Sequence, residues 1–123
     1  MPDFEDERGW ITDLVTGPDY AVTQIFTKEG SVRGNHYHKK TTQTVHVLYG
    51  QLLCRSGAMG EFVGYAISAS DRILDAGQSV TEFAEQTHAW RALKDTLVVV
   101  ITRGPRSGKN YESDTFRLET PLL

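Results

Sequence analysis

Short apolar segments that end at glycines dominate this chain, and a helical repeat of apolar positions is almost absent. Residues 21–27 are followed by a Glu-Gly pair, and residues 44–49 end at Gly50. Side chains alternate between the two faces of an extended strand, so these segments predict strands closed by tight turns. Further strands are predicted at residues 61–67, 72–74, 79–83, 88–93 and 97–101.

The last of these segments, residues 97–101, is continuously apolar and mostly β-branched, which predicts a strand buried on both faces. Many short strands in one small chain favour a closed sandwich or barrel, because long open edges invite aggregation. Only residues 114–118 are also compatible with a short helix, and residues 104–108 predict a loop. The predicted fold class is therefore all-β.

Composition and charge narrow the class of protein. The 123 residues, 39% hydrophobic and 24% charged, predict one soluble domain over residues 1–123. A net charge of -3 without a basic block argues against a nucleic-acid partner. No apolar run is long enough to span a membrane, and the acidic opening differs from a signal peptide. The lone Cys54 cannot form an internal disulfide, so a cytoplasmic location is expected.

Two histidines separated by one residue are the clearest chemical signal. On an extended strand, His36 and His38 point to one face and Tyr37 points to the other. Imidazole transfers protons near neutral pH and binds transition metals, so such a pair favours chemistry. The spacing alone leaves open a pair of surface histidines on a polar strand.

A family resemblance extends this observation. The spacing of His36, His38, Gln43 and Gly50 resembles the first motif of the cupins, which usually have glutamate at the Gln43 position. His88 looks like the histidine of the second cupin motif, although the residues before it depart from the family pattern. The resemblance implies a single small β-barrel of the jelly-roll type, in agreement with the strand pattern.

Three groups of cupins share longer stretches with this chain. Residues 4–11 and 33–37 resemble segments of the dTDP-4-dehydrorhamnose 3,5-epimerases. Residues 36–43, with a histidine pair, a lysine pair and a glutamine, resemble the dTDP-sugar 3,4-ketoisomerases. They also resemble the cupin half of a zinc-containing capsular-polysaccharide enzyme. The resemblance implies isomerisation or epimerisation of a nucleotide-linked 4-keto-6-deoxy-sugar, by proton removal beside the carbonyl and return through an enediolate, without a required cofactor.

The resemblance also implies roles for single residues. Either His36 or His38 would be the catalytic acid and base, and the sequence leaves open which one. The ketoisomerases have a tyrosine in the strand before the histidine pair, where this chain has none. The role of proton donor would then have to be filled by another tyrosine, namely Tyr37, Tyr49, Tyr65 or Tyr111. Tyr37 is expected to point away from the histidines.

Four residues are predicted to bind the substrate. Arg8 and Arg33 would contact the diphosphate, since guanidinium presents a planar fork of donors to phosphate oxygens. Each arginine stands beside a glycine, where a missing side chain would admit a ligand. Gln43 and Trp90 would complete the pocket, with Trp90 either as an apolar wall or as a core residue.

Two other functions remain open at this point. His36, His38 and His88 with Gln43 would provide three nitrogens and an amide oxygen for zinc or a similar divalent metal. Alternatively, the chain is a cupin that binds a small molecule without turnover. A homodimer is expected in each case, because small barrels of this type commonly pair their sheets, and the N-terminal segment would reach a neighbour's pocket.

Overall fold

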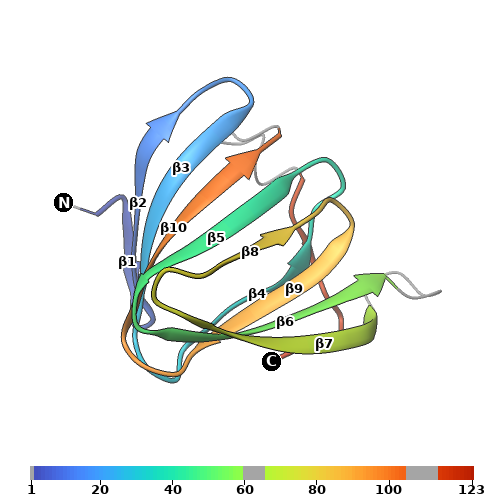
Figure 1. Ribbon diagram of the computed structural model, residues 1–123. Coiled ribbons are helices and arrows are strands. Elements are labelled where there is room, and N and C mark those ends of the chain that lie inside the picture. Colours follow the sequence, from blue (N-terminus) through green and yellow to red (C-terminus); the bar gives the residue numbers. More distant parts are fainter. Residues whose placement is uncertain (1, 60–65, 105–113) are drawn as a thin grey trace.

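Two antiparallel β-sheets that face each other form the fold (Figure 1). The computed structural model describes residues 2–59, 66–104 and 114–123. In chain order, the strands are β1 (Phe4–Asp6), β2 (Gly9–Thr16), β3 (Tyr20–Thr27), β4 (Val32–Tyr37), β5 (Thr42–Tyr49), β6 (Gln51–Met59), β7 (Ala66–Asp75), β8 (Ser79–Glu82), β9 (Gln86–Ala92), β10 (Thr96–Arg103) and β11 (Phe116–Arg117). One sheet has the order β1-β2-β3-β10-β5-β8, and the other has the order β11-β4-β9-β6-β7.

Strands account for every regular element in the described ranges, which confirms the predicted all-β class. None of these residues forms a helix of the length and hydrophobicity needed to cross a bilayer. The predicted strands at 21–27, 44–49, 79–83, 88–93 and 97–101 correspond to β3, β5, β8, β9 and β10. Strands β2 and β6 were not among the predicted segments.

Two predicted segments differ from the structure. The strand predicted at 61–67 falls mostly on residues 60–65, which lie outside the described residues, and its last two residues begin β7. That strand continues through residues 72–74, so two predicted strands overlap one observed element. The alternative of a helix at 114–118 is wrong, because Phe116 and Arg117 pair with β4 as β11. Of the predicted loop at 104–108, residues 105–108 also lie outside the described residues.

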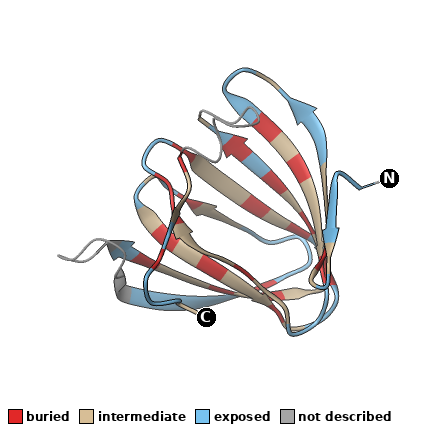
Figure 2. Ribbon diagram, turned by 180° about the vertical axis from the view of Figure 1, so that it is seen from behind, coloured by how far each residue is buried: buried red, intermediate tan, exposed pale blue. Residues whose placement is uncertain are grey.

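The hydrophobic core lies between the two sheets, and buried positions recur along their strands (Figure 2). Its buried members come from β5, β6, β7, β9 and β10, and they are Val45, Val47, Leu52, Cys54, Leu74, Ala92, Val98 and Val100. The prediction that residues 97–101 are buried on both faces is wrong. β10 alternates instead, with Val98 and Val100 in the core and Ile101 38% exposed. Its outward side chains belong to the outer face of the six-stranded sheet.

Candidate functional site

Strand β4 carries an extra residue that changes which face its side chains point to. Arg33 pairs with Trp90 and His36 pairs with His88 on β9, with a register shift between the two pairs. Asn35, whose φ of 58° lies in the left-handed region, takes up the extra residue as a β-bulge. On a regular strand, residues three positions apart face opposite sides. The bulge therefore lets Arg33 and His36 line the same cavity.

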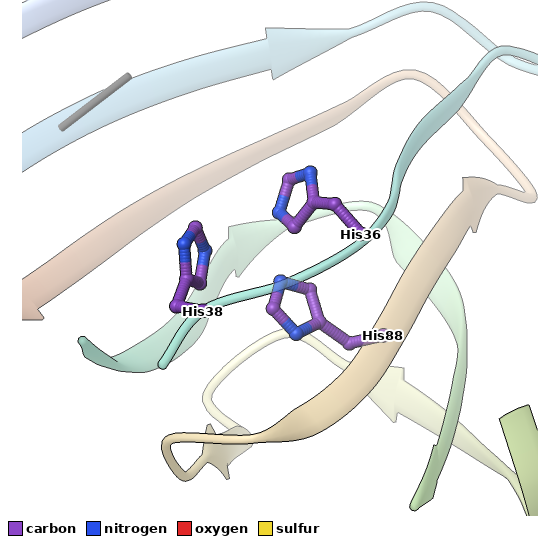
Figure 3. Close-up of side chains that lie close together, drawn as sticks. All are labelled: His36, His38 and His88. Carbon is purple, nitrogen blue, oxygen red and sulfur yellow. The ribbon is translucent and has the colours of Figure 1, made fainter. Parts of the chain in front are cut away.

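Three histidines converge at one end of β4 and β9 (Figure 3). His36 belongs to β4, His38 follows it directly, and His88 belongs to β9. Ring centroids are 4.5 Å apart for His36 and His88, 4.8 Å for His36 and His38, and 5.4 Å for His38 and His88. One nitrogen from each ring lies within 4.8 Å of the others. The structure thus brings together the three histidines selected from the sequence.

Burial makes two of these histidines weak bases. Burial, assisted by repulsion from His88, His38 and Arg117, lowers the pKa of His36 to about 2. Burial and repulsion from His38 lower the pKa of His88 to about 4, although the Gln86 backbone partly favours its charged form. The Nδ1 atom of His36 is buried and has no hydrogen-bond partner among the described residues. A neutral imidazole keeps a lone pair, which is the form that binds a cation.

His38 is held by the segment that precedes β11. Its Nδ1 lies 2.8 Å from the carbonyl oxygen of Asp114, and the residue is 2% exposed. The neutral tautomer that donates this bond has its lone pair on Nε2. The Asp114 carboxylate accepts hydrogen bonds from Thr41 Oγ1 at 2.6 Å and from the amides of Lys39 and Lys40 at 3.2 and 3.0 Å. Although burial opposes ionisation, these bonds hold the pKa of Asp114 below its usual value.

A cavity of about 190 Å³ adjoins the histidines and is lined by residues of both sheets. His36 and His88 line it, together with Arg8, Arg33 and Arg117. Typical small-molecule sites exceed about 300 Å³, so this cavity suits one ring or one small acid. The guanidinium groups make it attractive to an anionic group.

The two arginines predicted to bind phosphate also contact the protein itself. Arg33 is 7% exposed, and it donates from Nε to Thr27 Oγ1 at 2.9 Å and from Nη2 to the Phe26 carbonyl at 3.1 Å. Arg8 donates from Nε and Nη2 to the Asp6 carboxylate at 2.9 and 2.7 Å. Both arginines are therefore held in place at the cavity with part of their donor capacity already used.

Gln43 and Trp90, the other predicted substrate contacts, line the same cavity. Gln43 donates from Nε2 to Thr102 Oγ1 at 3.3 Å. The indole Nε1 of Trp90 is buried and finds no acceptor within the part of the chain that the structure describes. A buried donor without an acceptor costs free energy, so this N–H is suited to an oxygen of a bound ligand.

Glu82 is a cavity residue that sequence reasoning missed. It is 5% exposed, and Ser56 Oγ donates to its Oε1 at 2.6 Å, which links β6 to β8 across the two sheets. Burial raises the pKa of Glu82, and the hydrogen bond from Ser56 opposes this effect. β8 pairs with β5 so that Glu82 lies opposite Gln43. A signal in the sequence was available: Glu82 stands two residues after the apolar Val80 on the same strand, so both side chains point to the inner face.

The glycines beside the arginines make room for neighbouring strands, and Gly34 also lines the cavity. The sequence predicts that they admit a ligand. At Gly34, where φ is 94°, an added Cβ would lie 2.9 Å from the His88 carbonyl oxygen and 3.0 Å from the Ala89 Cα. At Gly9, an added Cβ would collide with the Phe26 carbonyl. In both places the missing side chain makes room for a neighbouring strand.

The tyrosine donor of the ketoisomerases has no counterpart among the described residues that line the cavity. Tyr37 is 5% exposed and stacks on Phe116 with ring centroids 5.3 Å apart. Tyr49 is 49% exposed. Tyr65 and Tyr111 lie outside the described residues.

The two facing antiparallel sheets form a barrel of the jelly-roll type. Comparison with protein-family models and with curated proteins finds no match. Solved structures do match. The capsular polysaccharide assembling protein CapF from Staphylococcus aureus is 24% identical, with a TM-score of 0.75 over 94% of this chain and 31% of CapF.

Two further structures share the fold. The Lactobacillus farciminis oxalate decarboxylase is 20% identical, with a TM-score of 0.71 over 94% of this chain and 35% of that one. A Klebsiella pneumoniae protein with a double-stranded beta-helix domain is 14% identical, with a TM-score of 0.64 over 89% and 78% of the two chains. This chain spans about a third of the length of CapF and of the decarboxylase. At these identities the comparisons establish the cupin fold.

Proposed function

We propose that this chain is a metal-dependent cupin enzyme that isomerises or epimerises a nucleotide-linked 4-keto-6-deoxy-sugar. His36, His38 and His88 would hold a divalent cation, zinc or a similar metal. The observation that carries the proposal is the convergence of three imidazoles, with one nitrogen from each within 4.8 Å of the others. Three nitrogen ligands leave a coordination position open, as catalytic metal sites require.

The three histidines fit a metal ion after a small adjustment. Two nitrogens bound to one tetrahedral zinc at about 2.0–2.1 Å lie about 3.4 Å apart, so the rings would turn slightly inward. The buried Nδ1 of His36, which has no hydrogen-bond partner among the described residues, gains one if it coordinates the ion. When bound, a divalent cation supplies Lewis-acid polarisation of a carbonyl oxygen.

The cavity residues support a sugar as the ligand. The Trp90 indole N–H would donate to a sugar oxygen, and Gln43 would contact a hydroxyl from the opposite sheet. A cavity of about 190 Å³ suits the sugar ring, while the nucleotide would lie outside it. The diphosphate that joins the sugar to the nucleoside would then be bound by the three arginines that line the cavity, Arg8, Arg33 and Arg117.

The resemblance of residues 36–43 to the 3,4-ketoisomerases supports this reaction class. The fold similarity to CapF, which assembles capsular polysaccharide, is consistent with a role in sugar metabolism.

Two measurements test the proposed function. Metal content after zinc loading should approach one ion per chain in the wild type and should be lost in His36→Gln and His88→Gln. The matched control is His46→Gln, because His46 lies outside the cluster and its Nδ1 contacts Ser79 Oγ at 2.6 Å. Unchanged zinc content in both cluster variants would refute the metal centre.

The reaction is tested in heavy water. Mass spectrometry should detect deuterium in dTDP- or UDP-linked 4-keto-6-deoxyglucose incubated with the zinc-loaded protein. The absence of uptake with both sugars, relative to an enzyme-free control, would refute the reaction. Binding of either sugar without uptake would instead support a non-catalytic ligand-binding cupin.

A second candidate is histidine acid–base catalysis without a metal. The contact between His38 Nδ1 and the Asp114 carbonyl favours it, because this contact orients the ring as a proton acceptor through Nε2. Under this mechanism, chelator-treated protein keeps its exchange activity, and His36→Gln or His38→Gln abolishes it.

A homodimer is proposed as the assembly. Val15, Tyr20 and Ile101 are 50%, 42% and 38% exposed on strands of the six-stranded sheet, which gives that sheet apolar surface for a second copy. Arg8 lines the cavity of its own chain, so the site does not need the predicted arm from a neighbour. A monomeric mass in analytical ultracentrifugation would refute the dimer.

A further inference from the structure

Glu82 is the single carboxylic acid among the described residues that line the histidine cavity. With Cys54 and Val80, it also lines a second cavity of about 300 Å³, to which Ser70 and Arg72 of β7 contribute. Glu82 therefore stands in the wall between the two cavities. Its Oε1 is held by Ser56, so the orientation of the carboxyl is fixed.

The proposed metal centre leaves the cavity with few groups that can transfer a proton. Histidines that coordinate a cation donate their lone pairs to it, so those nitrogens no longer accept protons. The guanidinium groups of the cavity are hydrogen-bond donors and offer no lone pair to accept a proton. Burial, with a further contribution from the charge of Glu82, raises the pKa of the Cys54 thiol to about 12. Among the described residues that line this cavity, Glu82 is the remaining acid or base.

We propose that Glu82 is the proton-transfer residue of this cavity and that it moves a proton between adjacent carbons of the keto-sugar. This inference rests on the function proposed above. Its carboxylate takes the proton from the carbon beside the carbonyl, the C–H electron pair forms a C=C bond, and the carbonyl pair moves to oxygen. Glu82 is then protonated and the sugar is an enediolate.

The second half of the reaction returns that proton. The neighbouring hydroxyl passes its proton to the enediolate oxygen, and its electron pair forms the new C=O bond. The C=C pair takes the proton from Glu82 at the second carbon. No oxidant, reductant or other reactant is consumed. While protonated, Glu82 exchanges with water in the second cavity, so the product acquires solvent hydrogen.

The environment of Glu82 suits both directions of transfer. Burial raises the pKa of its carboxyl, which brings it closer to the pH at which proton removal and return are both efficient. The described tyrosines line neither cavity. Glu82 thus fills the role that the missing tyrosine of the ketoisomerases leaves open.

Glu82→Gln separates proton transfer from structure. Glutamine keeps the side-chain length and an oxygen that accepts the hydrogen bond from Ser56, but it cannot carry the proton. With zinc-loaded protein and dTDP-4-keto-6-deoxyglucose in heavy water, deuterium uptake should fall at least about 100-fold. KM should stay within about two-fold, and bound zinc should equal that of the wild type. Glu82→Asp should recover part of the rate. Glu29→Gln, at an exposed turn position, is the matched control and should leave all three quantities unchanged.

Each alternative result has a distinct meaning. Normal uptake in Glu82→Gln, with an active wild type, would overturn the role of Glu82 and leave the proposed function intact. Loss of zinc from Glu82→Gln, or a raised KM with normal kcat, would also overturn it, because Glu82 would then act on the metal or on binding. The absence of uptake by the wild type would overturn the proposed function, and the role of Glu82 with it.

Discussion

Acidification should destabilise the metal-free protein, because His36 and His88 are buried as neutral imidazoles. Burial lowers the pKa of His36 to about 2 and that of His88 to about 4. An unfolded chain restores the ordinary histidine pKa of about 6.5. Below that pH the unfolded chain binds more protons than the folded one, so the free energy of unfolding falls as the pH falls.

The two pKa values set the size and the range of the effect. The loss begins near pH 6.5 and continues down to about pH 4 for His88 and about pH 2 for His36. Its slope approaches about 1.4 kcal/mol per pH unit for each histidine. At pH 5 each histidine lowers the free energy of unfolding by about 2 kcal/mol, and the two together lower it by about 4 kcal/mol, because both remain neutral in the folded state. That sum is a large part of the total stability of about 5–15 kcal/mol that small domains have.

Urea unfolding of chelator-treated protein at pH 7.5 and pH 5, followed by tryptophan fluorescence, measures this loss. Glu82 acts in the opposite sense, because its raised pKa lets the folded protein take up a proton first. His88→Gln isolates the histidine contribution, since it removes one titrating group and leaves Glu82 in place. The wild type should lose about 2 kcal/mol more than His88→Gln between the two pH values. The control, His46→Gln, should match the wild type.

Equal losses in the wild type and His88→Gln would refute the reasoning. That result would mean that the folded protein accepts a proton at His88 near pH 6.5, so the ring would not be buried as a neutral group.

Three other substitutions test the packing around the site. Gly34→Ala should destabilise the protein by more than about 2 kcal/mol and reduce zinc binding, because the added Cβ would press on β9. Gly30→Ala is the control: its φ is similar but the space around it is open, so backbone strain should lower the stability by only about 1 kcal/mol. Asp114→Asn should cost about 1–3 kcal/mol in urea unfolding and weaken zinc affinity, since one carboxylate oxygen becomes a donor facing backbone amides. Leu52→Ala should lower the free energy of unfolding by about 2–5 kcal/mol, because Leu52 is 0% exposed. Leu48 is 44% exposed, so Leu48→Ala should change it by less than about 1 kcal/mol. Similar losses for the two leucines would contradict the assigned core.

The sequence predicts the features that depend on neighbouring residues. Short apolar segments that end at glycines identify β3 and β5, and a continuous apolar run identifies β10. The one-residue spacing of His36 and His38 places both on one face. His88 could be added only through the cupin resemblance, because nothing in its local pattern distinguishes it from a core histidine. The alternation of β10 was hidden, since Val99 and Ile101 on its outer face are as apolar as the inward residues.

Features that depend on distant contacts were not predictable. Asp114 contacts His38 from 76 residues away, and no local spacing relates the two. Glu82 belongs to no motif, and its importance depends on its position between two cavities. β6 was missed because Arg55, Ser56 and Gly57 interrupt its apolar pattern. Pairing with β7 and β9 stabilises it instead.

The bulge at Asn35 has a consequence for comparing this chain with other cupins. Arg33 and His36 share a face only because one additional residue stands between them. A relative without the bulge needs one residue fewer to present the same arginine and histidine. An ungapped alignment with such a relative would match Arg33 to an outward-facing position and score the two cavities as different. An alignment of this strand should therefore place its gap at Asn35, so that residues whose side chains point in the same direction are compared. Only after this step can the absence of an arginine from the other protein indicate a different substrate.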